Sequence, residues 1–403
     1  MADNKENRIP NVPHLRFPEF CGEWVETTLG KISEITKGSG ISKDQLSEQG
    51  SPCILYGELY TKYKSEIINE VYSRTELEPS SLVKSMANDV IIPCSGETAI
   101  DISTARCVPF DNILLGGDLN IIRLRNDDGG FFAYQLNSTR KKDIARVAQG
   151  VSVVHLYGEN LKQIRVYHPN TEEQKKITRL LSLIDERIAT QNKIIEKLES
   201  LIKGLVDELM TVLLKGKLYP FSSFYIKAGE GGTPTTSVVE YYTEGTIPFI
   251  KIEDLSCKYL TNNKDFITEL GMQKSSAWLI PSKSVIYSNG ATIGAISINE
   301  YPVCTKQGIL GIVPNTNINV EYLYLLMSSS YFSKEISRII TEGTMKTAYL
   351  KDINHIKCPL PSMAQQKNIT NLTSSIEEKL SIEQELLRFL NLQKQYLLHM
   401  IFI

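Results

Sequence analysis

Few residues in this chain have the types and spacing that enzymatic chemistry requires. A Glu-x-Lys pattern found in many nucleases occurs at Glu377-Glu378-Lys379, but it falls inside a segment predicted to be helical, so we interpret it as a solvated helical face. The glycine-rich stretch Gly229–Pro234 has no lysine to complete a phosphate-binding P-loop, and we expect it to make a turn. No Pro-Pro pair exists to form the Asn/Asp-Pro-Pro-aromatic loop of amino-methyltransferases. We therefore predict no catalytic residue.

The cysteines and histidines do not favour a metal site either. The chain has seven scattered cysteines without a CxxC pair, and its five histidines never fall at metal-ligand spacing near them. Scattered thiols, together with a polar start that lacks the apolar core of a signal peptide, indicate the reducing cytoplasm. No stretch approaches the roughly 18 apolar residues of a membrane span. We expect a cytoplasmic protein with no metal and no cofactor of its own.

Positive residues gather at comparable places in the two halves of the chain, although the net charge is −2. Duplex DNA is bound mainly through its phosphates, so a near-neutral chain must cluster its positive charge or share the task with partners. Lysine and arginine mixed with tyrosine, serine and asparagine is the composition expected where phosphates are bound and base edges are read. Each lysine could equally be an ordinary solvated side chain. The candidates of this kind are Tyr56, Lys62, Tyr63, Lys64, Arg140, Lys141, Lys142 and Arg146 in the first half, and Lys251, Lys334, Arg338 and Lys346 in the second.

Two short loops of small polar residues form a second candidate surface for DNA. Glycine beside such residues allows close approach of the backbone to a ligand, although it can also serve only a tight turn. The candidate residues in these loops are Ser95, Glu97, Thr98, Ser288, Asn289 and Thr292.

The candidates recur because the chain repeats itself with a period of about 190 residues. The segment Ile184-Asp185-Glu186 recurs as Ile376-Glu377-Glu378, at an offset of 192. Further matches, at similar offsets, relate Pro52–Ile54 to Pro248–Ile250 and Val90-Ile91 to Val285-Ile286. Since the matches keep their order while the residues between them differ, we interpret the chain as two copies of one unit, each a globular domain followed by a long helix.

Both helices begin with the same kind of signal. A proline precedes Thr171–Ile177 and Ser362–Ile369, and each segment opens with a hydroxyl residue three positions before a glutamine. This spacing predicts a capping box, in which Thr171 pairs with Gln174 and Ser362 pairs with Gln365.

The apolar residues of both helices follow the alternating spacing of a coiled coil. In the first helix this pattern runs over five heptads with only Gln191 polar, and residues 171–215 would span roughly 65 Å. Matched length and register predict that the helices pair with each other, although each could instead pack on its own domain. The residues predicted to mediate pairing are Ile177, Leu181, Ile184, Ile188, Ile195, Leu198, Ile369, Ile376, Leu380, Leu387 and Leu390.

The predicted fold class is α+β: two similar domains joined and separated by two long antiparallel coiled-coil helices, with a pseudo-twofold internal repeat. Short β-rich runs such as Val90–Ile92 and Ser284–Tyr287 alternate with turn residues, and helical patches lie near Phe131–Val147 and Val320–Ile340. The expected boundaries are an arm at 1–20, a first domain at 21–168, a first helical spacer at 169–217, a second domain at 218–361 and a second spacer at 362–403.

Several short motifs, in this order, resemble the specificity subunits of type I restriction-modification systems. Leu15-Arg16-Phe17-Pro18 followed by Trp24 looks like the family's entry segment. Gly231–Pro234, followed by Gly245–Leu255, looks like the start of one of its target recognition domains. Ser95–Thr98, Gly116–Leu119 and the segment from Pro169 to Ile177 are similar to further parts of that family. The likeness covers nearly the whole chain.

The resemblance implies a non-catalytic, sequence-specific DNA-binding subunit. In this family each head domain reads one half of a split double-stranded site, and the paired helices fix the gap. The helices dock two methyltransferase subunits, and restriction subunits join to translocate and cut, so that S-adenosylmethionine, ATP and Mg²⁺ belong to the partners. The second helix departs from the pattern by being shorter and by having Glu383 and Lys394 at inner positions, so the gap cannot be carried over.

Two interpretations from other classes remain open at this point. The chain could be an architectural scaffold with two binding heads and no restriction-modification partners, which would recover no methyltransferase subunit in a pulldown. It could also be an enzyme with an unrecognised active site, which would methylate or cleave DNA by itself.

Overall fold

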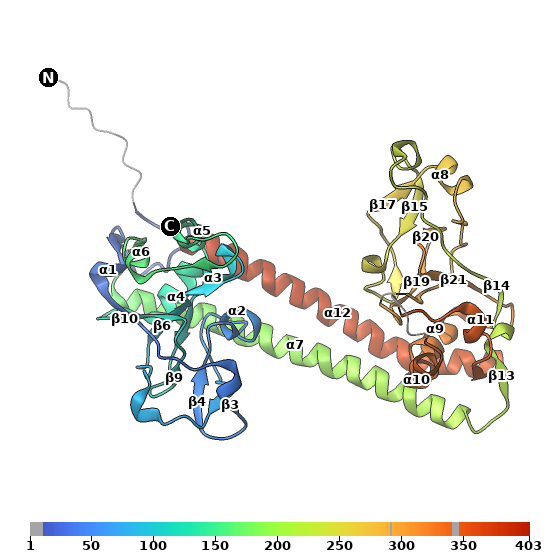
Figure 1. Cartoon of the computed structure of the whole chain (residues 1–403), viewed down its shortest axis with the longest axis horizontal. Helices are drawn as coiled ribbons and strands as arrows, with labels where there is room; N and C mark the ends of the chain where they lie inside the picture. Colours follow the sequence, from blue (N-terminus) through green and yellow to red (C-terminus); the bar gives the residue numbers. More distant parts are fainter. Residues whose placement is uncertain (1–10, 291, 341–345) are drawn as a thin grey trace. The chain divides into compact units, whose positions relative to one another are not determined.

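The computed structural model describes residues 11–290, 292–340 and 346–403, and the chain divides into two units (Figure 1). Unit 1 comprises the residues up to Asn192 together with Glu385–Ile403, and unit 2 comprises Lys193–Gln384. Each unit holds one mixed head domain and a part of each long helix, α7 (Thr171–Leu213) and α12 (Met363–Ile401). The expected mixture of helix and sheet in two domains is therefore found.

The head of unit 1 is built on a four-stranded antiparallel sheet. Its central strands consist mostly of apolar residues and are buried almost throughout, as expected for a sheet covered on both faces. The strand order is β2 (Ser33–Lys37), β10 (Leu119–Leu124), β6 (Asp89–Pro93) and β8 (Arg106–Val108). A second sheet has the order β3 (Leu46–Ser47), β5 (Ser73–Thr75), β4 (Ser51–Ile54) and β9 (Leu114–Leu115).

Shorter elements complete this head and cover its sheet. Trp24 and Phe131 are buried in the core, where their rings pack edge to face at 5.5 Å. The paired strands are β1 (Val25–Thr28) with β12 (Arg165–His168), and β7 (Ser95–Gly96) with β11 (Val154–His155). The helices are α1 (Leu29–Ile32), α2 (Glu58–Thr61), α3 (Ala99–Ile102), α4 (Gly129–Asn137), α5 (Lys141–Val147) and α6 (Gly158–Lys162).

The head of unit 2 is built in the same way. Its main sheet has the order β14 (Tyr225–Glu230), β21 (Ile309–Pro314), β18 (Val285–Ser288), β19 (Ile296–Asn299) and β16 (Tyr259–Leu260). Its second sheet has the order β17 (Asp265–Ile267), β15 (Ile247–Ile250) and β20 (Cys304–Thr305), and β13 (Leu218–Pro220) pairs with β22 (Lys357–Pro359). The helices are α8 (Glu269–Gln273), α9 (Val320–Ser328), α10 (Ser330–Ile339) and α11 (Leu350–Ile353).

Strand pairing confirms the matches that revealed the repeat. Strands β4 and β15 contain the matched segments Pro52–Ile54 and Pro248–Ile250, and each pairs antiparallel with one neighbour and parallel with another. Strands β6 and β18 contain the next match, and each lies between two antiparallel partners. The two heads therefore share one frame.

The capping box predicted for the start of α7, between Thr171 and Gln174, is wrong. The Asn170 carboxamide oxygen, rather than the Thr171 hydroxyl, accepts the helical N–H of Glu173, at 2.9 Å. Thr171 instead donates to the Asn126 carbonyl, at 3.1 Å. The capping box at the start of α12 is confirmed, because Ser362 N–H donates to the Gln365 side chain at 3.0 Å and Gln365 N–H donates to the Ser362 hydroxyl at 3.4 Å.

The repeated glutamine joins each long helix to the head of its unit. The Gln174 side chain accepts the Asp128 N–H at 2.8 Å and donates to the Pro169 carbonyl at 2.9 Å. Gln366 makes the same two bonds, with Asn319 N–H at 2.8 Å and with the Pro361 carbonyl at 2.9 Å. The structural counterpart of Gln174 is therefore Gln366, one position beyond the glutamine that the capping pattern suggested.

The residues predicted to mediate helix pairing are all buried or half-buried. In unit 1, Ile177 and Leu181 of α7 share a core cluster with Ile401 of α12. In unit 2, Val206 and Met210 of α7 share a cluster with Ile369 of α12. Pairing along the whole length of the two helices stays a prediction. In the described part of the chain, no helix is long and apolar enough to cross a membrane.

Candidate nucleic-acid interface

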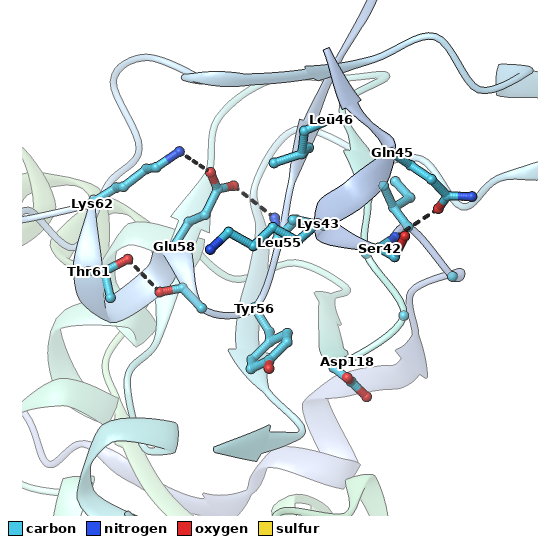
Figure 2. A pocket seen from close by; sticks show the side chains of 15 residues that line it. Ser42, Lys43, Gln45, Leu46, Leu55, Tyr56, Glu58, Thr61, Lys62 and Asp118 are labelled. Atoms are coloured by element: carbon cyan, nitrogen blue, oxygen red, sulfur yellow. Dashed lines mark hydrogen bonds and ion pairs between the residues drawn. The ribbon is translucent and has the colours of Figure 1, made fainter. Parts of the chain in front are cut away.

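A hollow of about 1020 Å³ opens on the head of unit 1 and is lined by two of the predicted DNA-binding residues (Figure 2). Three loop segments form it: 40–46, 55–62 and 116–118. Tyr56 and Lys62 come from the second of these segments. The lining is mixed, since Lys43, Gln45 and Asp118 stand beside leucine and isoleucine side chains. Such a surface offers both hydrogen-bonding groups and apolar contacts for base edges.

Glycines let the loops around this hollow come together. A Cβ added at Gly38 would lie 2.0 Å from the Gly116 carbonyl oxygen, and Gly117 packs against Gly40. The head of unit 2 has the same close approach, because a Cβ at Gly231 would lie 2.1 Å from the Thr305 carbonyl oxygen. The expectation that Gly229–Pro234 forms a turn is wrong: Gly229 and Glu230 end strand β14, residues 231–234 are irregular, and the glycine at 231 instead permits two backbone segments to pack closely.

A buried carboxylate orders the turn that carries Tyr56. Glu58 accepts the Leu55 N–H at 2.9 Å and the Lys62 ammonium at 2.7 Å, and it also accepts the Ser73 hydroxyl. Figure 2 shows the first two of these bonds from Glu58. In unit 2 the matching Asp254 accepts the Lys251 N–H at 2.8 Å. The frame behind these turns is thus repeated between the heads.

Tyr60 connects this turn to the loop at Ser95–Thr98. A Cβ at Gly57 or at Gly96 would lie 3.7 or 3.8 Å from the Tyr60 hydroxyl. Burial raises the pKa of Tyr60, and the nearby Tyr56, Asp101 and Glu97 raise it further. Thr98 accepts the Asp101 N–H at 3.1 Å and thereby caps α3, while Glu97 is exposed. The structure therefore brings the first and second candidate surfaces of unit 1 together.

Two lysines of the candidate set are already engaged by carboxylates. Lys62 is bound by Glu58 while remaining half exposed, and Lys251 pairs with Asp265 at 2.8 Å. The hydrogen bond to Asp265 raises the pKa of Lys251. Lys64 is exposed and donates to the Thr61 carbonyl at 3.3 Å, so its charge is open to a phosphate.

Three of the predicted DNA-binding residues are buried, so the prediction is wrong for them. Tyr63 is 5% exposed and its ring stacks on Tyr72 at 5.5 Å, with its pKa raised chiefly by burial. Ser288 and Asn289 are buried, and Asn289 donates to the Ala348 carbonyl at 3.1 Å. Each stands in or beside a polar loop, but the tertiary fold turns the side chain into the head. None of the three presents its side chain to a nucleic acid.

The basic cluster around α5 separates into anchored and free residues. Arg140 donates to the carbonyl of Ile403 and lies over the Tyr167 ring at 5.1 Å, so it holds the chain end. Lys141 is half-buried, and burial lowers its pKa. Lys142 is exposed, and the Arg146 side chain is 76% exposed although it pairs with Asp143 at 2.9 Å. These last two are the best placed for phosphates.

The remaining candidates of unit 2 are exposed. Thr292 and Lys346 lie in irregular segments, and Lys334 and Arg338 lie on α10. Arg338 pairs with Glu335 one helical turn away. The structure gathers Lys334 and Arg338 on one helix.

The sequence interpretation missed Lys43 and Gln45, which line the hollow, as well as a pair of stacked rings. His155 and Tyr157 stack at 6.2 Å, and both are exposed. Flat rings of this kind are suited to contact sugars and bases. The glycines before Lys43 could have indicated a loop that approaches a ligand, whereas nothing in the local sequence distinguishes His155.

No group of histidine, cysteine or acidic residues that could hold a metal ion occurs among residues 11–290, 292–340 and 346–403. The seven cysteines are all free thiols. The arrangement as a whole offers polar, basic and aromatic groups on loops over a rigid frame, which is suited to recognition.

A family model for the type I restriction modification DNA specificity domain matches the chain twice, at residues 22–200 and 224–391. The type I restriction enzyme MjaIX specificity subunit of Methanocaldococcus jannaschii is 30% identical over 154 residues, which are 37% of this chain and 35% of that relative. The chain thus spans only about a third of the length of this relative. The MjaVIII specificity subunit of the same organism is 23% identical over 411 residues, covering 94% of this chain and 92% of the relative.

A solved structure shares the fold. The crystal structure of the type I restriction-modification S subunit from M. genitalium aligns with a TM-score of 0.60 and 19% identity, over 97% of this chain and 99% of that one.

Proposed function

The chain belongs to the type I restriction-modification DNA specificity family, and on that premise we propose that it is the subunit through which a type I complex recognises its DNA sequence. Specificity subunits are non-catalytic, and this chain is a non-catalytic member of the family. Each head reads one half of a split site in double-stranded DNA. The site residues are the exposed loop side chains around the hollow of unit 1 and their counterparts in unit 2.

One observation carries this proposal: the two heads repeat a backbone frame while the side chains on its loops differ. The turns at Glu58 and Asp254 have the same carboxylate-to-backbone bond, yet Tyr56 and Lys62 stand at the first turn and Ile252 follows Lys251 at the second. When two domains share a backbone frame but differ in their loop side chains, the same fold can recognise different ligands. It supports two different half-sites.

The long helices are proposed to serve two purposes, setting the gap between half-sites and docking partners. Within unit 1, α12 exposes Leu386, Phe389, Leu392 and Tyr396, which fall on one face at helical spacing. An apolar stripe left in solvent is characteristic of a docking surface. We assign this stripe to the docking of methyltransferase subunits, of which the complex holds two and which bind S-adenosylmethionine. Restriction subunits, with ATP and Mg²⁺, complete the complex.

A head exchange tests the proposal. Residues 24–168 are replaced by the matching head of another family member, and the chimera is expressed with methyltransferase subunits. Methylome sequencing should show one half of the methylated motif changed and the other half and the gap retained. The reciprocal control exchanges residues 218–361 and should change the other half. A change in both halves from either exchange would contradict the assignment of one half-site to one head.

A further inference from the structure

The two heads present the same backbone position to the long helices but place opposite charges there. In unit 1 the Cys107 N–H donates to the Glu66 carbonyl at 2.8 Å, and in unit 2 the Ile298 N–H donates to the Lys258 carbonyl at 2.7 Å. Cys107 lies opposite Val90 on β6, and Ile298 lies opposite Val285 on β18. Glu66 and Lys258 are therefore structural counterparts, 192 residues apart, with a carboxylate in one head and an amine in the other.

The helix positions that face these residues are also counterparts. The offset of 192 that relates Gln174 to Gln366, which bind their heads identically, relates Asp185 of α7 to Glu377 of α12. Both are carboxylates. At these two positions unit 1 therefore has two acids, whereas unit 2 has a base and an acid.

In unit 1 the two acids are held by an amine from the other long helix. Lys394 of α12 pairs with Glu66 and with Asp185, each at 2.6 Å, and Asp185 also accepts the Tyr134 hydroxyl at 2.7 Å. The side chains of Lys394, Glu66 and Asp185 are 14%, 11% and 8% exposed. Burial lowers the pKa of Lys394, but the two carboxylates outweigh it and the pKa is raised.

Arg106, another cation near these acids, does not replace Lys394. The guanidinium of Arg106 is buried and donates to the carbonyl oxygens of Leu59, Tyr63 and Ala105. Burial is the main effect on its pKa, which is lowered. Lys394 is therefore the amine that pairs with both acids.

In unit 2 the charged residues that the structure describes at the junction come from the head and from α12, and α7 contributes none of them. Lys258 of the head pairs with Glu377 of α12 and with Glu321 of α9, each at 2.5 Å. The residue of α7 that corresponds to Lys394 is Ile202, again at an offset of 192, and it packs against the apolar core of unit 2. At the three corresponding positions unit 1 thus has Glu, Asp and Lys, and unit 2 has Lys, Glu and Ile, with Glu321 as a further acid in unit 2.

We propose that this charge swap makes the two junctions non-interchangeable, with Lys394 as the positioning residue that commits the end of α12 to the head of unit 1. The head of unit 1 placed on the helix residues of unit 2 would face Glu66 with Glu377 and Ile202, leaving two buried carboxylates without an amine. The head of unit 2 placed on those of unit 1 would bring Lys258 beside Lys394, where Lys258 would keep Glu321 of its own head but would share Asp185 with Lys394. Buried polar groups of this kind specify register and partner more than they add stability.

The consequence for recognition follows from the place of Glu66 in the chain. It lies two residues after the segment 62–64, and Arg106 binds the carbonyls of Leu59 and Tyr63 in the same region. Lys394 therefore acts through Glu66 on the loop that lines the hollow. This part of the inference rests on the proposed function, whereas the pairing of head and helix does not.

A rescue experiment on the full chain tests the pairing. Lys394→Ile should lower the thermal unfolding midpoint by about 5–10 °C, because breaking a buried ion pair leaves an uncompensated charge. Adding Glu66→Lys places an amine beside Asp185, as Lys258 stands beside Glu377 in unit 2, and should recover at least half of that loss. Glu66→Lys alone should be less stable than the double variant. Arg388→Ile, which removes an exposed ion pair with Glu385 from the same helix, should shift the midpoint by less than about 2 °C.

A double variant no more stable than Lys394→Ile would overturn the inference, as would an equal loss from Arg388→Ile. These measurements need no DNA, so they stand whether or not the proposed function holds. Methylome sequencing with the same variants is the second readout. Lys394→Ile should reduce methylation at sites of the full motif, and Glu66→Lys should restore it in the double variant.

Discussion

At the scale of single residues, the candidate interface divides according to what each side chain already binds. Lys62 and Lys251 are held by Glu58 and Asp265, and Arg140 is held by the end of the chain. Lys64, Lys142 and Arg146 leave their charges largely in solvent. An exposed cation contributes to DNA affinity through counterion release, whereas a cation bound by a buried carboxylate chiefly positions its loop.

Arg146→Ala should weaken DNA binding by the assembled complex without changing the motif. If Arg146 contacts one phosphate, the slope of log affinity against log salt concentration should fall in magnitude by about 1. Fluorescence anisotropy with labelled DNA at several salt concentrations measures this slope. Arg165→Ala, a similarly exposed arginine of the same head outside the candidate set, is the control and should leave the slope unchanged. A changed methylation motif would mean instead that Arg146 reads bases.

At the scale of elements, the long helices depend on one glutamine each for their attachment to a head. Gln174 and Gln366 are fully buried, and each bridges the N-terminus of a head helix, α4 or α9, and the proline before its own helix. A buried amide that loses its partners costs free energy, and removing the glutamine leaves a backbone N–H and a carbonyl without theirs.

Gln366→Ala should lower the free energy of unfolding by about 2–3 kcal/mol, and Gln174→Ala should do the same, because each removes at least three hydrogen bonds of a buried amide. Gln365→Ala is a matched control, since this neighbour is exposed and only caps the helix, and it should cost about 1 kcal/mol or less. Chemical denaturation monitored by circular dichroism measures the difference. Equal losses from Gln365→Ala and Gln366→Ala would show that the bridge to the head adds nothing.

At the scale of the whole molecule, the proposed gap between half-sites depends on helix length. One heptad inserted within 171–213 and one within 363–401 adds about 10 Å to each helix, which corresponds to about 3 base pairs of duplex DNA. Methylome sequencing should then report the same two half-sites with a longer gap, or no methylation at all. Two unchanged half-sites at an unchanged gap would remove the role of the helices as a ruler.

The predictions made from sequence succeeded where the signal is local and repeated. Apolar runs such as Val90–Ile92 specify a buried strand by themselves, and an ordered series of matches specifies a duplicated frame. The sequence-based predictions failed where more than one hydrogen-bond partner is available to a side chain. Thr171 has the spacing of a capping box, but Asn170 takes that role, because the fold brings the Asn126 carbonyl within reach of the Thr171 hydroxyl.

The amino-acid sequence by itself determined the repeat, the two long helices and the mixed class of the heads, because each follows from periodicity or from the order of motifs. Only the tertiary structure decided which candidates are exposed and which groups pair across long separations. Tyr63 and Ser288 stand in or beside polar loops and are nevertheless buried. Lys394 meets Glu66 across 328 residues, and nothing local to either predicts it. Burial and ion pairing depend on distance in space, which a one-dimensional pattern does not contain.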